Sequence, residues 1–150
     1  MIEDEYLAFV AAFQTEHREL QQLVQALKRP FGADRPWSRE LASEAARVID
    51  KLEIHLRQHF AQEEEGGYLE QALAVAPRFH DDAESLLRQH GSMLQQIDQV
   101  VAAAKGALVD ENLWRRLQVQ VKELLRNLIA HETAENQIVQ QALNTGIEAD

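Results

Sequence analysis

The sequence predicts an all-α protein, an up-down-up-down antiparallel four-helix bundle. Through four long segments, apolar residues recur at steps of three and four, the spacing of one face of a helix. Glycine and proline number only 6 and 3, and most of them fall between or at the ends of those segments. No stretch shows the alternation of apolar and polar residues that marks a half-buried strand. Four amphipathic segments with short connections favour a bundle.

The ends of the segments are marked in the sequence. The first extends from residue 2 to residue 29 and stops at Pro30, and the third spans residues 79–105. The second begins near Ser38 and reaches residue 75; the glycines at 66 and 67 leave open either a kink in one helix or a break. The fourth follows Asp110, which is predicted as its N-cap. With no linker, repeat or low-complexity tract, residues 1–150 are expected to form a single domain.

Composition restricts the possible partners. The chain of 150 residues has 25 Asp and Glu against 15 Lys and Arg, a formal net charge of −10. Such an acidic surface argues against nucleic acid and against an anionic membrane as partners. The acidic start, MIEDEYLAFV, lacks the pattern of a signal peptide, and no apolar run approaches the ~18 residues of a membrane span, so we expect a cytoplasmic protein. Because cysteine is absent, a bound metal must be held by His, Asp or Glu.

Histidine and glutamate interrupt the apolar stripes of two predicted helices at core positions. In the second segment the stripe continues from Leu56 to His59 and Glu63, and in the fourth it contains His131 and Glu135. Side chains four residues apart project from nearly the same face of a helix. Each pair is therefore predicted to point into the bundle.

The other two segments each add one inward histidine, His17 and His90. With alternating helix directions and a rise of about 1.5 Å per residue, all these side chains fall at a similar height, provided that the second segment continues through its two glycines. A buried carboxylate costs several kcal/mol unless it is paired or bound to a cation, and the facing stripes offer no Lys or Arg. A metal cluster satisfies this requirement, and iron accepts mixed imidazole and carboxylate ligands. The predicted metal ligands are His17, His59, Glu63, His90, His131 and Glu135.

The other histidines and the glutamates next to Glu63 are not predicted to bind the metal. His55, one turn before His59, is expected to be exposed rather than to support the site, and His80 is expected at the surface. Glu64 and Glu65 are expected on a solvated face, because only Glu63 shares the face of His59. A single inward histidine is more often a hydrogen-bonded core residue than a ligand, so the prediction depends on the whole set.

These residues resemble the hemerythrin-like (HHE cation-binding) family from His17 to Glu135. The segment 59–64, HFAQEE, matches the "HFxxEE" of the family's second helix, and 131–135, HETAE, matches the "HxxxE" of its fourth. The resemblance implies an up-down bundle around two non-haem iron ions joined by oxide or hydroxide. It implies that the four histidines are terminal ligands and that Glu63 and Glu135 bridge the irons.

Two departures from the oxygen-carrying members bear on function. Those carriers have two histidines four apart on the third helix, whereas Leu86 and Leu94 flank His90 at that spacing. They also have an aspartate five residues after the fourth-helix histidine, where this chain has Asn136. Both departures argue against simple reversible oxygen carriage.

Three functions are therefore considered. The leading hypothesis is a di-iron binding protein, rather than an enzyme, that binds or senses oxygen or a related diatomic molecule, or handles iron. The second is a di-iron oxidoreductase acting on oxygen, peroxide or nitric oxide. The third is a metal-free structural bundle with a buried polar network. The sequence does not identify a protein partner.

Overall fold

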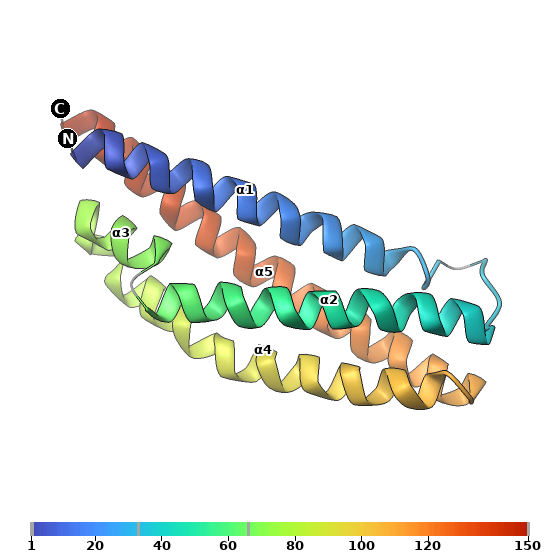
Figure 1. The fold of residues 1–150 in the computed structure, drawn as a ribbon. Coiled ribbons are helices and arrows are strands. Elements are labelled where there is room, and N and C mark those ends of the chain that lie inside the picture. The colour runs from blue at the N-terminus through green and yellow to red at the C-terminus, as the bar shows by residue number, and fades with distance from the viewer. Residues whose placement is uncertain (1, 33, 66, 150) are drawn as a thin grey trace.

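The computed structural model describes residues 2–32, 34–65 and 67–149. Four long helices are present, together with a short α-helix and one 3-10 turn (Figure 1). In chain order the elements are α1 (Ile2–Lys28), α2 (Arg39–Glu64), α3 (Tyr68–Val75), η1 (Pro77–Phe79), α4 (His80–Ala107) and α5 (Glu111–Ala149). The described residues contain no strand, so the prediction of an all-α bundle is confirmed.

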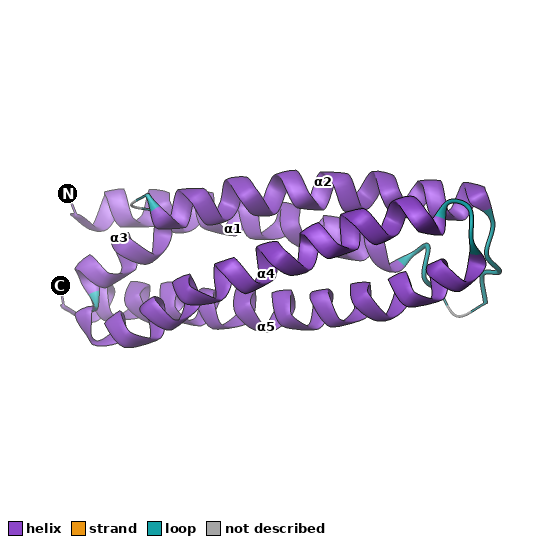
Figure 2. Ribbon diagram, turned by 90° about the horizontal axis from the view of Figure 1, so that it is seen from below, coloured by secondary structure: helices purple, strands orange, loops and turns teal. Residues whose placement is uncertain are grey.

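The long helices lie side by side with alternating directions (Figures 1 and 2). α1 contacts α2 and α5, and α4 contacts the same two helices from the other side. The start of α1 and the end of α5 lie at one end of the bundle, and the connections α1–α2 and α4–α5 lie at the other, which we call the loop end. α3 packs against α5 and α1 at the terminal end. None of the helices in the described ranges is long and apolar enough to cross a membrane.

Side-chain caps explain where two of the helices begin. The Ser38 hydroxyl accepts a hydrogen bond from the backbone N–H of Leu41 at 3.0 Å, which satisfies one free donor in the first turn of α2. The Asp110 carboxylate accepts from the backbone N–H of Asn112 at 2.8 Å, so its predicted capping role at α5 is confirmed. These caps fix where α2 and α5 begin relative to the residues further along each helix.

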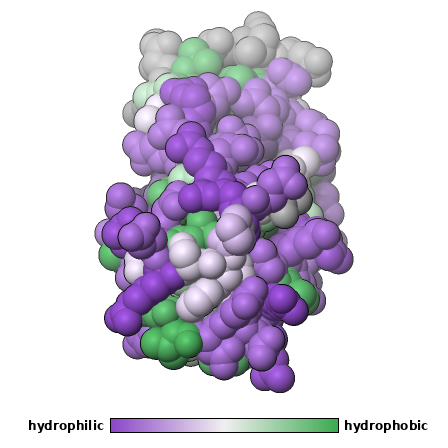
Figure 3. Space-filling view, turned by 90° about the vertical axis from the view of Figure 1, so that its right-hand side faces the viewer, coloured by the Kyte–Doolittle hydropathy of each residue, from purple (hydrophilic) through white to green (hydrophobic). Residues whose placement is uncertain are grey.

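Aromatic contacts close the loop end. The indole N–H of Trp37 donates to the carbonyl oxygen of Ala107 at 2.9 Å, which ties the α1–α2 connection to the end of α4. The Phe31 ring stacks on Trp114 with centroids 4.5 Å apart. Figure 3 looks at this end, where hydrophilic residues surround a small hydrophobic patch. The two connections are thus held to the bundle by specific contacts.

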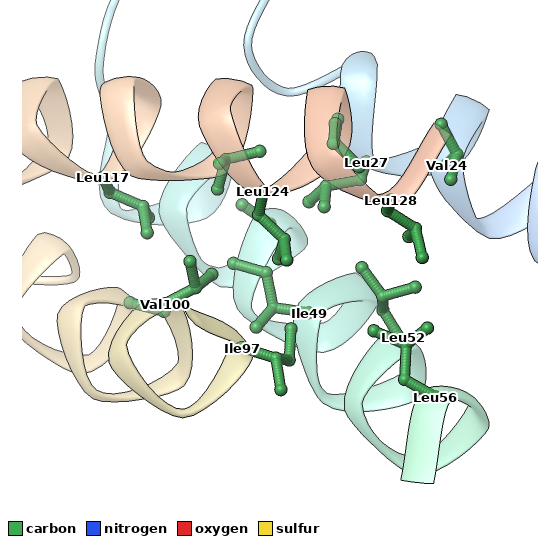
Figure 4. Close-up of a cluster of buried hydrophobic side chains, with 14 of the residues drawn as sticks. Val24, Leu27, Ile49, Leu52, Leu56, Ile97, Val100, Leu117, Leu124 and Leu128 are labelled. Carbon is green, nitrogen blue, oxygen red and sulfur yellow. The ribbon is translucent and has the colours of Figure 1, made fainter. Parts of the chain in front are cut away.

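The core consists of two apolar clusters separated along the bundle axis. The larger one fills the loop half, where side chains from α1, α2, α4 and α5 meet (Figure 4). The smaller one fills the terminal half and includes Phe13, Leu69, Leu86 and Ile138. On α1 the sequence gap between the clusters runs from Phe13 to Leu20, and each of the other long helices has a similar gap or end there. Five of the predicted ligands lie in these gaps, and His59 lies at the edge of the larger cluster, between Leu56 and Phe60. Together they form one polar layer between two apolar regions.

α2 ends before the two glycines, of which Gly66 lies outside the described residues, and does not continue to residue 75. α2 stops at Glu64, the backbone N–H of Glu65 bonds to the carbonyl of Ala61 at 3.1 Å, and α3 begins anew at Tyr68. A Cβ atom at Gly67 would collide with the carbonyl oxygen of Gln62, so the chain needs glycine there for close approach. Glu63 therefore lies in the last turn of α2. From the sequence, we expected the ligands to share one height only if the second helix continued through its glycines. The layer forms although α2 ends at Glu64.

Two glycine substitutions should change stability in opposite directions. Gly67→Ala should lower the free energy of unfolding by about 1–3 kcal/mol, because its methyl group has no space without a backbone shift. Gly91→Ala should raise it by about 0.5–1 kcal/mol, because an added Cβ meets nothing within 4 Å at this exposed position inside α4. Denaturant unfolding of both variants measures the two effects. Equal effects would show that the α2–α3 turn does not depend on close packing.

Candidate metal centre

Five of the six predicted ligands are buried together in the polar layer. His59, His90 and His131 are each 1% exposed, Glu63 is 3% exposed and Glu135 is 0% exposed. They come from α2, α4 and α5, in the gap between the two apolar clusters. In the described part of the chain, every buried polar or charged side chain is a histidine or a glutamate. The carboxylates therefore have no buried Lys or Arg to balance them.

Each of the two predicted bridging carboxylates reaches two histidines. The Glu63 Oε1 atom lies 2.5 Å from His59 Nε2, and its Oε2 atom lies 2.8 Å from His90 Nε2. The Glu135 Oε1 atom lies 3.5 Å from His59 Nε2, and its Oε2 atom lies 3.4 Å from His131 Nε2. A carboxylate that spans two histidines in this way is placed to bridge two cations.

The donor atoms form two sets with one shared residue. One set contains His59, Glu63, Glu132 and Glu135, and the other contains Glu63, His90 and His131. Within each set the donor atoms lie within 4.8 Å of one another. Each of the two groups could hold a metal ion, and Glu63 is common to both.

The donors facing the centre meet only one another. The Nε2 atoms of His59, His90 and His131 and both carboxylate oxygens of Glu63, Glu132 and Glu135 are buried without a hydrogen bond of suitable geometry. Buried polar groups are almost always satisfied, and an unsatisfied one costs about 1–3 kcal/mol. Cations at the centre would satisfy all of these atoms at once, so the residues fit a metal cluster.

The opposite nitrogen of each buried histidine has a partner on a neighbouring helix. Nδ1–H of His59 donates to Glu16 Oε1 at 2.5 Å, and Nδ1–H of His90 donates to Glu64 Oε1 at 3.1 Å. Nδ1–H of His131 donates to Gln89 Oε1 at 3.0 Å. Such outer contacts orient a metal-binding histidine and leave its Nε2 lone pair facing inward. We call Glu16, Glu64 and Gln89 the outer acceptors.

The outer acceptors correct one expectation. Glu64 was expected on a solvated face; its side chain is 54% exposed, but its carboxylate also reaches His90. Each outer acceptor is next in sequence to a predicted ligand, because a residue one position away on a helix is rotated by about 100° toward the neighbouring helix. The sequence signal for the outer acceptors was therefore a polar residue directly beside His17, Glu63 and His90.

His17 lies at the edge of the cluster rather than inside it. Its side chain is 19% exposed, its Nδ1 atom lies 3.5 Å from Glu132 Oε2, and its Nε2 atom lies 3.2 Å from Gln21 Nε2. It belongs to neither donor set. Its role as a ligand stays a prediction.

Glu132 joins the cluster although it was not predicted. It is 4% exposed, and its Oε1 atom lies 3.2 Å from His59 Nε2. A stripe one residue wide along α5 does not include Glu132, because α5 buries adjacent pairs of residues at a spacing of seven. These pairs are Leu124 with Leu125, His131 with Glu132, and Ile138 with Val139. Adjacent buried pairs of this kind give α5 a wide buried face, and this pattern was the sequence signal for Glu132.

The cluster shifts the pKa values of its members. Burial alone would lower the pKa of His59, but contacts with Glu132, Glu135, Glu16 and Glu63 raise it far above its ordinary value. The pKa of His90 is also raised, because Glu63 and Glu64 outweigh the effect of burial. Burial raises the pKa of Glu135. Without a cation, His59 and His90 therefore hold their protons to higher pH than an ordinary histidine does.

The two remaining histidines differ from each other. His55 was expected to be exposed, but it is partly buried, and its ring stacks on His59 with centroids 6.2 Å apart. Burial and the charge of His59 lower its pKa. The expectation was wrong because the His55 ring packs along the edge of the same helix face. His80, with a side chain 66% exposed, lies at the surface as expected.

A groove connects the cluster with the surface. It has a volume of about 690 Å³ and lies between α1 and α5. His17 and Glu132 form part of its wall, together with apolar side chains such as Leu20 and Leu128. The buried layer is therefore approachable from the α1–α5 side.

Comparison with known proteins identifies the family. The model of the hemerythrin HHE cation-binding domain matches residues 8–143. No curated protein and no solved structure gives a significant match. The matched range includes all of the buried histidines and glutamates described above. The chain belongs to the hemerythrin HHE cation-binding domain family.

Proposed function

We propose that this chain is a non-haem di-iron protein that binds or senses oxygen or a related diatomic molecule, or handles iron. The observation that supports this best is the set of buried histidine and glutamate donor atoms, arranged as two groups that share Glu63. His59, His90 and His131 would bind through Nε2, and Glu63 and Glu135 would bridge. His17 would complete the set from its position at the edge. Iron suits this choice because the donors are only imidazole and carboxylate.

The chain's own residues would orient and shield the metal ligands. The outer acceptors hold three histidine rings with Nε2 inward. The Phe60 ring stacks on His90 with centroids 4.0 Å apart and meets His131 edge-on at 5.5 Å. The apolar clusters on both sides exclude water from the layer. When bound, the two iron ions would supply redox chemistry and open positions for a small ligand.

A second function is favoured by the groove. The groove would admit a small substrate to the His17 and Glu132 edge of the centre. This access fits a di-iron oxidoreductase acting on oxygen, peroxide or nitric oxide as well as it fits a sensor. Steady turnover with an added reductant would distinguish the enzyme from the binding protein. The metal-free structural bundle has less support, because protons on the histidines alone would have to compensate the buried carboxylates.

Removing a bridging carboxylate should reduce metal binding. Iron should bind at about two ions per chain, as expected for two donor sets that share a carboxylate. Glu63→Ala and Glu135→Ala should weaken iron affinity by more than the roughly 10–100-fold expected for outer partners. Glu65→Ala is the matched control, because Glu65 is exposed beside the same turn. Metal analysis after dialysis against a chelator measures the difference, and equal iron retention in all three variants would contradict the ligand assignment.

Metal binding should release protons at neutral pH. In the metal-free chain the raised pKa values keep His59 and His90 protonated to higher pH than an ordinary histidine. A cation must displace these protons, so its affinity should rise as pH increases and fall as pH decreases. Calorimetric titration with Fe²⁺ in buffers of different ionisation enthalpy measures the protons released. A binding heat that does not depend on the buffer would disprove this expectation.

Exposure to air should oxidise the reduced iron-loaded protein irreversibly. The chain lacks the additional third-helix histidine of the oxygen carriers, and a groove reaches the centre, so the irons should be accessible to oxidants. Visible absorption is followed while the anaerobic ferrous protein is mixed with oxygen and then placed under vacuum. We expect conversion to a ferric product that does not return. Repeated recovery of the starting spectrum would instead support reversible oxygen carriage.

A further inference from the structure

We propose that Glu132 is a seventh protein ligand of the metal centre, and that it makes the two metal positions chemically unequal. This inference rests on the proposed binding of two iron ions. It adds a residue that the "HxxxE" pattern of the fourth helix does not include, since that pattern is satisfied by His131 and Glu135.

The position of Glu132 is that of an inward donor. The residue is 4% exposed, and both of its carboxylate oxygens are buried without a hydrogen bond of suitable geometry. Its donor atom lies within 4.8 Å of those of His59, Glu63 and Glu135. A buried carboxylate with no Lys or Arg beside it is costly unless a cation is bound. His59 compensates it only in part, because Glu16, Glu63 and Glu135 also contact that histidine, and His17 lies 3.5 Å away.

The atoms that Glu132 contacts separate it from the outer acceptors. Glu16, Glu64 and Gln89 each contact the Nδ1 atom of a buried histidine, on the side away from the centre. Glu132 approaches Nδ1 of His17 with Oε2 at 3.5 Å, but it approaches Nε2 of His59 with Oε1 at 3.2 Å. The Nε2 atom of His59 is the one that faces the centre. One oxygen of Glu132 is therefore available to a cation while the other stays near His17.

The two metal positions would then differ in their donors. The position at His59 would have carboxylates from Glu63, Glu132 and Glu135, with His17 at its edge. The position at His90 and His131 would have two imidazoles and the bridging carboxylates Glu63 and Glu135, but not Glu132. Hard anionic oxygen donors favour ferric iron relative to neutral imidazole. The position at His59 should therefore be oxidised more easily than the other.

The test compares Glu132→Gln with Glu123→Gln, an exposed residue on the same helix. Iron content and affinity are measured by competition with a chelator, and the two irons are examined by Mössbauer spectroscopy of the ⁵⁷Fe-loaded protein. The unmodified chain should bind two irons with two distinct doublets. Glu132→Gln should weaken one of the two irons by about tenfold or more and bring the doublets closer together, by analogy with the loss of an outer partner. Glu123→Gln should change neither.

A double-mutant cycle with His17→Gln separates ligation from positioning. If Glu132 is a ligand, Glu132→Gln should still weaken iron binding about tenfold when His17 is already replaced. If Glu132 acts only by orienting His17, the second substitution should have no further effect, and the inference would be overturned. Glu132→Asp retains the charge in case the glutamine variant does not fold, and it should weaken the same iron.

The failure of this inference is distinguishable from the failure of the proposed function. If the unmodified chain does not bind two irons, the proposed function and the inference both fail. If it binds two irons and Glu132→Gln retains both with unchanged affinity and unchanged doublets, only the role of Glu132 is disproved.

Discussion

The structure depends on one electrostatic constraint, which is that three carboxylates and three imidazoles share one buried layer. Glu63, Glu132 and Glu135 are all nearly inaccessible, and the described residues bury no Lys or Arg that could balance them. In such surroundings a charge must be compensated by protons or by bound cations. The raised pKa values of His59 and His90 show the first form of compensation. The family match and the inward lone pairs point to the second.

The position at which α2 ends helps to enclose this layer. Because α2 ends at Glu64, one residue after Glu63, the chain turns at Gly67 and α3 covers the terminal half. A continuous second helix would have carried residues 65–75 straight along the bundle axis. The break instead places Leu69 in the smaller apolar cluster, beside Phe13 and Ile138. The polar layer is thereby enclosed by apolar side chains on both sides.

The fold and the centre of the site were predictable because helical periodicity is a strong signal. A histidine and a glutamate four apart on an apolar stripe must point inward together, so His59 with Glu63 and His131 with Glu135 could be placed from the sequence. Glu132, Glu16 and Gln89 were harder, since residues adjacent to a stripe face either solvent or the next helix, depending on how the helices rotate. The fate of Gly66 and Gly67 was also open, because a glycine pair is compatible with a kink or an end. Packing decides each of these cases, and packing is not local in sequence.

The outer contacts of the histidines follow one direction around the bundle. Glu16 of α1 holds His59 of α2, Glu64 of α2 holds His90 of α4, and Gln89 of α4 holds His131 of α5. Glu132 of α5 then lies 3.5 Å from His17 of α1, which closes the circle.

These four contacts form a closed belt around the bundle, and the belt aligns the helices along the bundle axis. Apolar stripes alone allow one helix to slide past another by a turn, about 5.4 Å, while still burying similar area. Such a slip would break the belt on both sides of the helix that moved. These four contacts therefore fix the axial register of the helices. The hydrophobic effect alone would tolerate several such registers.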